Sequence, residues 1–132
     1  MAKVYIINTN FSNNQSCEKN MLQSAKCSAY CDPWKYYIDE IEANDIVFLY
    51  KSGTGIIARG IATGIVEKAD YNGIKDDEHY MYLDRFQILE KPLEASKISD
   101  LVGHRVQYNQ TIISVAYRFG MNIWQYITKN NL

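Results

Sequence analysis

The stretch DIVFLYKSGTGIIARGIATGIV, residues 45–66, decides the fold of this chain. Residues 45–50 are rich in β-branched and aromatic side chains, and two glycines follow within residues 52–55. A second apolar run then extends from Ile56 to Val66. Two strand-like runs joined by a short turn that contains glycine are typical of a β-hairpin. We therefore expect a β-hairpin across these residues.

The second strand of this hairpin has one face made only of small residues: Ala58, Gly60, Ala62 and Gly64. Successive side chains of a strand point to opposite faces, so these four lie together. A face without bulk allows a neighbour to approach the backbone closely. We expect that neighbour to be a packed helix or a ligand.

The flanking sequence contains further strand and helix patterns. Strand patterns occur at residues 3–7, 80–89 and 110–115. Helical patterns occur at residues 17–29, 33–41, 94–101 and 117–129. Asp32-Pro33 is a helix-start signal with Asp as the N-cap, and Gly103 is a helix-stop signal. Residues 70–78 are predicted to form a polar loop.

These elements predict one α+β domain over residues 1–132. A chain of 132 residues with 47% hydrophobic content has room for one core. Most strands follow one another with short connections, which favours a mostly antiparallel sheet. A twisted sheet of five to six strands that closes toward a barrel, with helices around it, leaves few edges exposed.

The composition argues against several classes of protein. The 14 Lys and Arg residues and 15 Asp and Glu residues give a net charge of −1, which disfavours a broad basic face for duplex DNA. No apolar run approaches the ~20 residues of a membrane span, and the N-terminus has no signal-peptide pattern. Three cysteines cannot all pair within the chain, so we expect a reducing, cytoplasmic location.

The residue types that carry catalysis occur without a recognisable pattern. His79 and His104 have no metal-ligand spacing with each other or with the cysteines, so no metal or cofactor is expected. The run Asp76-Asp77-Glu78-His79 lies in the predicted polar loop, where a solvated charge run is the simpler interpretation. No phosphate-binding glycine motif and no nucleophile elbow is present. The sequence therefore supplies no positive case for catalysis.

Three features point instead to a pocket for a planar group. Asn8-Thr9-Asn10 places amide and hydroxyl groups at the end of a strand. Trp34 stands at a helix start, where an indole could stack, and Tyr50-Lys51-Ser52 ends the best strand. Unpaired bases are held by aromatic stacking and by hydrogen bonds to the base edge. The alternatives are that Trp34 only closes the core and that the asparagines only form turns.

The order of these motifs resembles the EVE domains and, more distantly, the YTH domains of the PUA-like superfamily. The most specific stretch is Asn44 to Ser52 followed by Gly55 to Ala62. The match continues with Leu89-Glu90-Lys91-Pro92-Leu93 before a short helix, and with the tail Asn109 to Val115. The resemblance covers nearly the whole chain.

The resemblance implies a barrel-like PUA-like fold and recognition of a modified base, typically methylated, in nucleic acid. It implies that a ligand-binding pocket is formed by Asn8, Thr9, Asn10, Trp34, Tyr50, Ser52, Gln110 and Ser114. The polymer, DNA or RNA, stays open, as does a separately encoded effector protein as partner.

Two other functions stay open at this point. An enzyme acting on nucleic acid or nucleotides would need an acid or base in the pocket, for which Asp84 and Lys51 are the candidates. A protein-interaction domain would use a tyrosine-rich surface, and the chain has 11 tyrosines.

Overall fold

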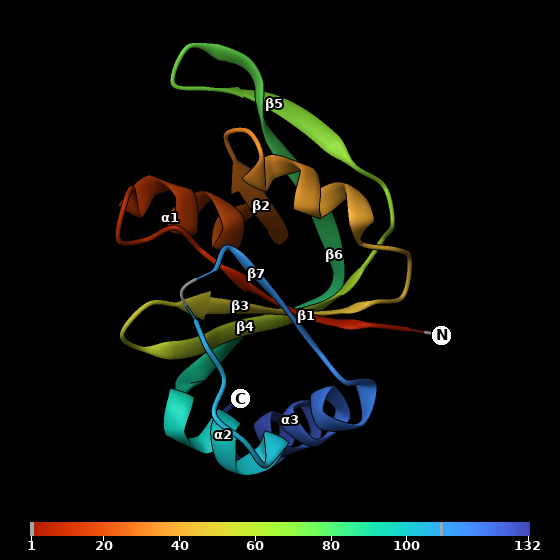
Figure 1. Cartoon of the computed structure of the whole chain (residues 1–132). Coiled ribbons are helices and arrows are strands. Elements are labelled where there is room, and N and C mark those ends of the chain that lie inside the picture. The colour runs from red at the N-terminus through yellow and green to blue at the C-terminus, as the bar shows by residue number, and fades with distance from the viewer. Residues whose placement is uncertain (1, 109) are drawn as a thin grey trace.

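One curled sheet with helices on both faces forms the fold, in a computed structural model that describes residues 2–108 and 110–132 (Figure 1). In chain order the elements are β1 (Val4–Asn8), α1 (Gln15–Ser24), β2 (Lys26–Tyr30), the 3₁₀ helix η1 (Trp34–Glu40), β3 (Ile46–Lys51), β4 (Gly55–Ala62), β5 (Glu67–Tyr71), β6 (Ile74–Leu93), α2 (Ala95–Val102), β7 (Ile112–Val115) and α3 (Tyr117–Asn130).

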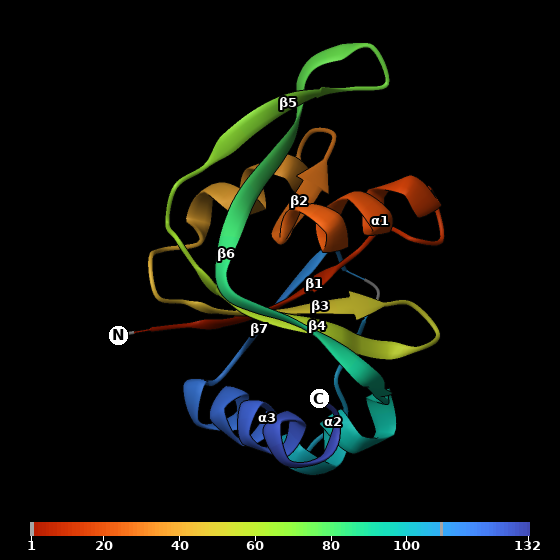
Figure 2. The same cartoon turned by 180° about the vertical axis from the view of Figure 1, so that it is seen from behind.

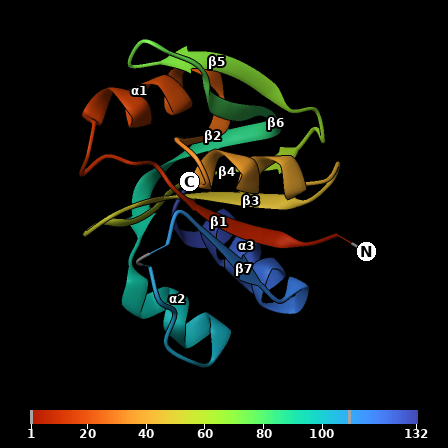
Figure 3. The same ribbon diagram turned by 45° about the horizontal axis from the view of Figure 1, so that its top comes forward.

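The sheet has the strand order β2-β6-β4-β3-β1-β7, and β5 pairs with β6 beside this path. The β1–β3 pair is parallel, whereas the other pairs are antiparallel. The 20-residue strand β6 pairs with β2, β4 and β5 and passes from the β5 side of the molecule to α2 (Figure 3). The result is a half-barrel, which confirms the predicted α+β fold class.

The helices cover the two faces of the sheet separately. α2 and α3 lie together on one face, and α1 and η1 lie on the other (Figures 1 and 2). Val4 and Ile6 of β1 are buried in the cluster that contains α2 and α3, while Tyr5 and Ile7 are buried in the cluster that contains α1 and η1. Strands covered on both faces show continuous apolar runs, which explains why β1 does not alternate with polar residues.

The central hairpin is confirmed. β3 pairs with β4, beginning with Ile46 opposite Ile61 and ending with Lys51 opposite Gly55. Its second strand ends at Ala62, so the prediction that it continues to Val66 was wrong. β3 starts beside a buried Asp45, whose carboxylate accepts hydrogen bonds from the Lys3 and Glu42 backbone N–H groups, each at 2.9 Å.

Two residues of the small-residue face of β4, Ala58 and Ala62, are buried in the cluster that contains α1 and η1, in agreement with a packed helix. A Cβ on Gly60 would lie 2.7 Å from the Leu83 Cβ of β6. Near the end of this face, a Cβ on Gly64 would lie 2.6 Å from the backbone nitrogen of Ala43. The two glycines therefore allow a close approach of β6 and of the segment after η1, while the alanines of the same face are buried with residues of α1 and η1.

Two other local predictions were wrong, and both concern strands that pair with β6. The helix predicted over residues 17–29 ends at Ser24, because residues 26–30 pair with β6 as β2. The loop predicted over residues 70–78 is a hairpin of β5 and β6, with a tight turn at Asn72-Gly73 (φ 50° and 77°). Asn-Gly is the preferred pair for such a turn, so this signal was present in the sequence.

The acidic run Asp77-Glu78-His79 is buried, so the prediction of a solvated charge run was wrong. Asp77 and Glu78 each pair with a lysine of another segment, which compensates for the loss of water, and His79 pairs with the Asp39 carboxylate. Lys35 Nζ lies 3.2 Å from Asp77 Oδ1, and Lys26 Nζ lies 2.9 Å from Glu78 Oε2. His79 Nδ1 lies 2.8 Å from Asp39 Oδ1.

The remaining helices lie close to the positions predicted from the sequence. α2 ends at Gly103 with φ 87°, and α3 covers the predicted C-terminal helix. The segment after Asp32-Pro33 is helical as expected, but it is a 3₁₀ helix whose N-cap is Pro33 and not Asp32. Within the described residues, no helix has the length and apolarity needed to cross a membrane.

Candidate functional site

The candidate site begins where the parallel strands β1 and β3 end. Asn8 is aligned with Tyr50 in this pair, so the carboxyl ends of both strands lie at the same edge of the sheet. The Asn8 side-chain amide donates a hydrogen bond to Ser52 Oγ at 3.0 Å. Asn8 Oδ1 accepts a hydrogen bond from the Asn10 backbone N–H at 2.7 Å. These bonds hold the polar end of β1 in one conformation.

The chain turns sharply after β1. Asn10 has a positive φ of 64°, a conformation that asparagine tolerates better than most residues. Thr9 is fully buried, and its hydroxyl donates to Glu18 Oε1 of α1 at 2.8 Å. Asn8 and Asn10 therefore lie at the site, whereas the Thr9 side chain is buried beneath it.

Aromatic side chains from three different segments complete the wall. Tyr30 ends β2, Trp34 starts η1, and Tyr71 ends β5. The Tyr30 and Tyr71 ring centroids lie 4.4 Å apart, whereas Trp34 is 48% exposed. The Tyr71 hydroxyl accepts a hydrogen bond from the Asn14 amide at 3.3 Å, which ties the β5–β6 turn to the start of α1.

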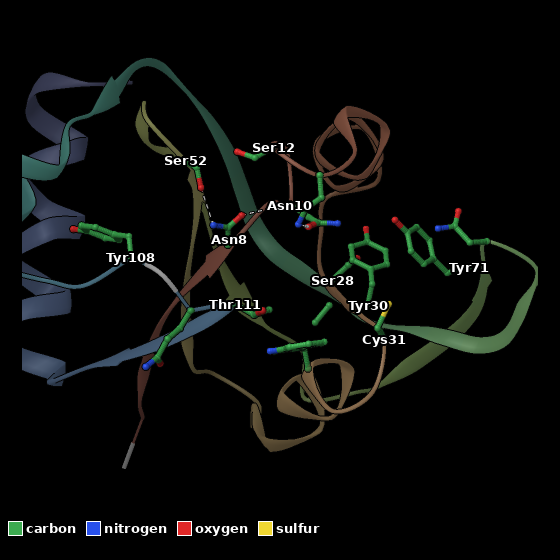
Figure 4. A pocket seen from close by; sticks show the side chains of 15 residues that line it. Asn8, Asn10, Ser12, Ser28, Tyr30, Cys31, Ser52, Tyr71, Tyr108 and Thr111 are labelled. Carbon is green, nitrogen blue, oxygen red and sulfur yellow. Dashed lines mark hydrogen bonds between the residues drawn. The ribbon is translucent and has the colours of Figure 1, made fainter.

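Together these segments border an open cavity of about 660 Å³ (Figure 4). This volume is within the range of about 300–1,000 Å³ of small-molecule sites. Its lining comes from five segments: the end of β1 with the turn after it, the end of β2 with the start of η1, the turn after β3, the β5–β6 turn, and the segment before β7. The lining residues are Asn8, Asn10, Ser12, Asn13, Ser28, Ala29, Tyr30, Cys31, Trp34, Ser52, Tyr71, Asn72, Tyr108, Gln110 and Thr111.

A buried charge network lies next to the cavity wall. Ser28, a lining residue, donates from Oγ to Glu78 Oε2 at 2.8 Å, and Lys26 Nζ lies 2.9 Å from the same oxygen. The Tyr30 hydroxyl is buried without a hydrogen-bond partner among the described residues. Burial, and after it the Glu78 carboxylate, raise the pKa of Tyr30, so this phenol stays protonated as a potential donor.

The one thiol in the cavity lining, that of Cys31, is not activated. Desolvation and then the neighbouring Asp77 carboxylate raise the pKa of Cys31. A reactive cysteine needs a lowered pKa, so this position does not have the electrostatics of a catalytic nucleophile.

The structure brings five of the eight predicted site residues into this one cavity: Asn8, Asn10, Trp34, Ser52 and Gln110. Three others lie elsewhere. Thr9 is bonded to Glu18, and Ser114 is exposed on β7 and lines a different cavity. Tyr50 is buried on the opposite face of β3, where its ring stacks on Tyr108 at 4.1 Å with an interplanar angle of 3°.

The sequence reasoning missed Ser28, Tyr30 and Tyr71. Ser28 and Tyr30 were assigned to or beside a helix, and only pairing with β6 places them in a strand whose end reaches the cavity. Tyr71 immediately precedes the Asn-Gly turn, so recognising that turn would have placed it at a hairpin tip. Figure 4 shows Tyr30 and Tyr71 side by side, with Tyr108 apart from them.

The two candidate catalytic residues do not line the cavity. Asp84 is exposed on β6, and its backbone pairs with Ile61 of β4. Lys51 Nζ lies 3.8 Å from Glu18 Oε2 and 4.0 Å from the centre of the Phe11 ring. The arrangement around the cavity is therefore suited to stacking and hydrogen bonding more than to proton transfer.

Solved structures with the same fold include proteins of three kinds. ASCH from Zymomonas mobilis has 10% identity and a TM-score of 0.63, with 98% of this chain and 96% of that chain covered. A hypothetical protein from Leishmania major has 8% identity and a TM-score of 0.62, with 98% and 96% covered. The YTH domain-containing protein mmi1, in complex with RNA, has 10% identity and a TM-score of 0.62, with 96% and 81% covered.

These likenesses show the fold, which this chain shares with the ASCH and YTH domains. No protein-family model and no curated protein matches the sequence.

Proposed function

We propose that this protein is a nucleic-acid-binding reader of the EVE type, which holds one modified nucleobase, typically methylated, in the 660 Å³ cavity. The observation that carries this proposal is the lining itself. Aromatic rings and amide or hydroxyl groups converge there from five segments that are distant in the sequence. Recognition of an unpaired base needs both kinds of group.

The aromatic groups would supply most of the binding energy. Stacking on an aromatic side chain contributes ~1–3 kcal/mol per base. Trp34 is the best candidate, because nearly half of its surface is exposed and it stands at the start of η1. Tyr30 and Tyr71 already contact each other, so they form a preformed apolar wall.

The polar groups would read the edge of the base. Each amide offers an oxygen acceptor and two N–H donors. Asn8 uses one donor on Ser52 and accepts one bond from Asn10, which leaves capacity for a ligand. The net charge of −1 supplies little attraction to phosphates, so specificity for a base would matter more than general affinity for the polymer.

The fold neighbours support a nucleic-acid ligand. Two YTH structures that share this fold contain RNA. These two neighbours, at 10–11% identity, support the class of ligand, and the binding panel below distinguishes RNA from DNA.

The experiment is a binding panel read by fluorescence anisotropy at 50 mM KCl. The probes are fluorescein-labelled single-stranded 12-mers of RNA and DNA with a central N6-methyladenine, 5-methylcytosine or the unmodified base. We expect one modified probe to bind more tightly than its unmodified counterpart. We expect Trp34→Ala to weaken that binding by about 10-fold or more, the equivalent of one stacked base.

Tyr37→Ala is the matched control, because Tyr37 is an exposed aromatic residue of the same helix that does not line the cavity. It should bind the preferred probe like the wild type. If no probe binds the wild type, or if Trp34→Ala and Tyr37→Ala behave alike, the proposal is wrong.

A protein partner is the second candidate function. Trp34, Tyr36 and Tyr37 are 48%, 47% and 38% exposed on one short helix, and exposed aromatic clusters often mark interaction sites. This face of η1 is where a separately encoded effector would dock. In the panel above, a docking role alone predicts no binding of any oligonucleotide.

A further inference from the structure

A second, smaller cavity lies between the end of α2, β7 and the start of α3. Its volume is about 240 Å³, below the lower limit of about 300 Å³ for drug-sized ligands. It therefore suits a single base or sugar better than a larger molecule. Its lining residues are Val102, His104, Arg105, Val106, Gln107, Gln110, Ile113, Ser114, Val115, Ala116 and Phe119.

The two cavities share one lining residue, because Gln110 borders both. Gln110 and Ser114 were both predicted as ligand-binding residues, yet only Gln110 borders the larger cavity. Ser114 lines the smaller cavity, which Gln110 also borders.

Two arginine side chains lie at or beside this second cavity. The His104 ring lies 6.3 Å from the Phe119 ring, and the Arg118 guanidinium carbon lies 4.7 Å from the centre of the same ring. Arg105 is exposed and lines the cavity together with Phe119. Residues 101–132 contain Arg105, Arg118 and Lys129 but no Asp or Glu, the last acidic residue being Asp100.

This local charge contrasts with the charge of the whole chain. The protein has a net charge of −1, but Arg105 lines the second cavity, which Gln110 also borders. An anionic ligand would be attracted to this side of the larger cavity in particular. The apolar side chains of Val106, Ile113 and Phe119 supply a surface on which a planar group can pack.

We propose that the second cavity is a subsite for the nucleotide next to the one held in the larger cavity, with Arg105 and Arg118 facing the phosphates between and beside them. This inference rests on the proposed function and deepens it. The ligand is then single-stranded nucleic acid of at least two nucleotides, because bases in a duplex stay stacked and cannot occupy two separate cavities. A free modified nucleoside would fill only the larger cavity.

The experiment compares two ligands on two double variants. The ligands are the 12-mer of the panel that binds the wild type most tightly and the free nucleoside that carries the same base. The test variant is Arg105→Gln/Arg118→Gln, and the control variant is Lys68→Gln/Lys91→Gln, which removes the same charge from exposed positions on β5 and β6 outside both cavities.

We expect the test variant to bind the 12-mer more weakly and with a smaller dependence on salt. Each phosphate contact on a single strand contributes ~0.7 to the slope of log K against log salt, so two contacts contribute ~1.4. Between 50 and 200 mM KCl the affinity ratio of wild type to test variant should therefore shrink about 7-fold. Binding of the free nucleoside should be unchanged in both variants, and the control variant should retain the wild-type salt slope.

Amide chemical shifts give a second readout of the same inference. The 12-mer should perturb Val115 and Phe119, whereas the nucleoside should perturb residues of the larger cavity only. If the wild type binds the 12-mer no better than the nucleoside, or if the test variant keeps the wild-type slope, the second subsite does not exist. If the wild type binds neither ligand, the proposed function itself fails, and the subsite with it.

Discussion

Asn8 of β1 and Ser52, which follows β3, are joined by a hydrogen bond of 3.0 Å from the Asn8 amide to Ser52 Oγ. The bond connects the carboxyl ends of two parallel strands at the mouth of the larger cavity. Asn8 Oδ1 also accepts the Asn10 N–H at 2.7 Å, so the amide has a defined orientation before any ligand arrives. A group oriented in advance loses less entropy on binding.

Asn8→Ala should therefore weaken both the fold and the site. It removes two part-buried hydrogen bonds, each worth about 0.5–1.5 kcal/mol, so we expect the free energy of unfolding to fall by about 1–3 kcal/mol. Urea unfolding measures this loss, and anisotropy with the preferred 12-mer should show weaker binding. Asn20→Ala, on the exposed surface of α1, should change neither quantity by much. Unchanged binding by Asn8→Ala would remove Asn8 from the site.

Lys26→Met tests the buried charge network beside the cavity. Lys26 and Glu78 side chains are only 7% and 6% exposed and lie 2.9 Å apart. Without Lys26, the Glu78 carboxylate keeps only the hydrogen bond from Ser28, and an uncompensated buried charge typically costs about 3–5 kcal/mol. We expect a large drop in the urea midpoint. Lys68→Met, at an exposed position of the adjacent strand β5, should leave the midpoint almost unchanged.

Gly120→Ala should destabilise the protein although alanine favours helices. Helix propensity alone predicts a gain of about 1 kcal/mol inside α3. However, the added Cβ would lie 2.3 Å from a methyl group of Val4 in β1, so α3 would have to move away from the sheet.

The double variant Val4→Ala/Gly120→Ala separates these effects. Val4→Ala alone loses buried apolar surface, but it also makes room for the new Cβ. Adding Gly120→Ala to Val4→Ala should therefore cost much less than adding it to the wild type. Equal costs in the two backgrounds, measured by thermal or urea unfolding, would show that contact with Val4 is not the cause.

Cys27 should resist alkylation and should make the fold sensitive to alkaline pH. Burial raises the pKa of Cys27 from 9.0 to about 12, because the thiolate would lose its hydration. The folded state therefore binds this proton more tightly than the unfolded state. The resulting stability is present below pH 9 and is lost as the pH rises from 9 toward 12.

Cys27→Ala should therefore lose stability less steeply above pH 9 than the wild type. The slope of the unfolding free energy against pH should be smaller in magnitude by up to about 1.4 kcal/mol per pH unit. Urea unfolding between pH 8 and pH 10.5 measures the slope. With a thiol reagent at pH 8, the exposed Cys31 should react first and the buried Cys27 only on unfolding. Rapid reaction of Cys27 in the folded protein would contradict its burial.

The elements that the sequence predicted correctly are those with strong local patterns. The β3–β4 hairpin has two apolar runs around a glycine turn, α2 ends at Gly103, and α3 follows its helical periodicity. The polar run Asn8 to Asn10 was likewise recognisable as the end of a strand, β1. Local spacing decides these features, because turn geometry and side-chain periodicity act between residues close in the chain.

Only the tertiary structure decided which groups share the cavity. Residues 26–30 have a helix-compatible pattern and become a strand because β6 is beside them, and this pairing also buries Glu78 against Lys26. Tyr50 and Tyr30 could not be distinguished as site residues, since the face of the sheet on which each ring lies depends on long-range register. A shift of one residue in strand pairing moves a side chain to the other face, and no local pattern records that choice.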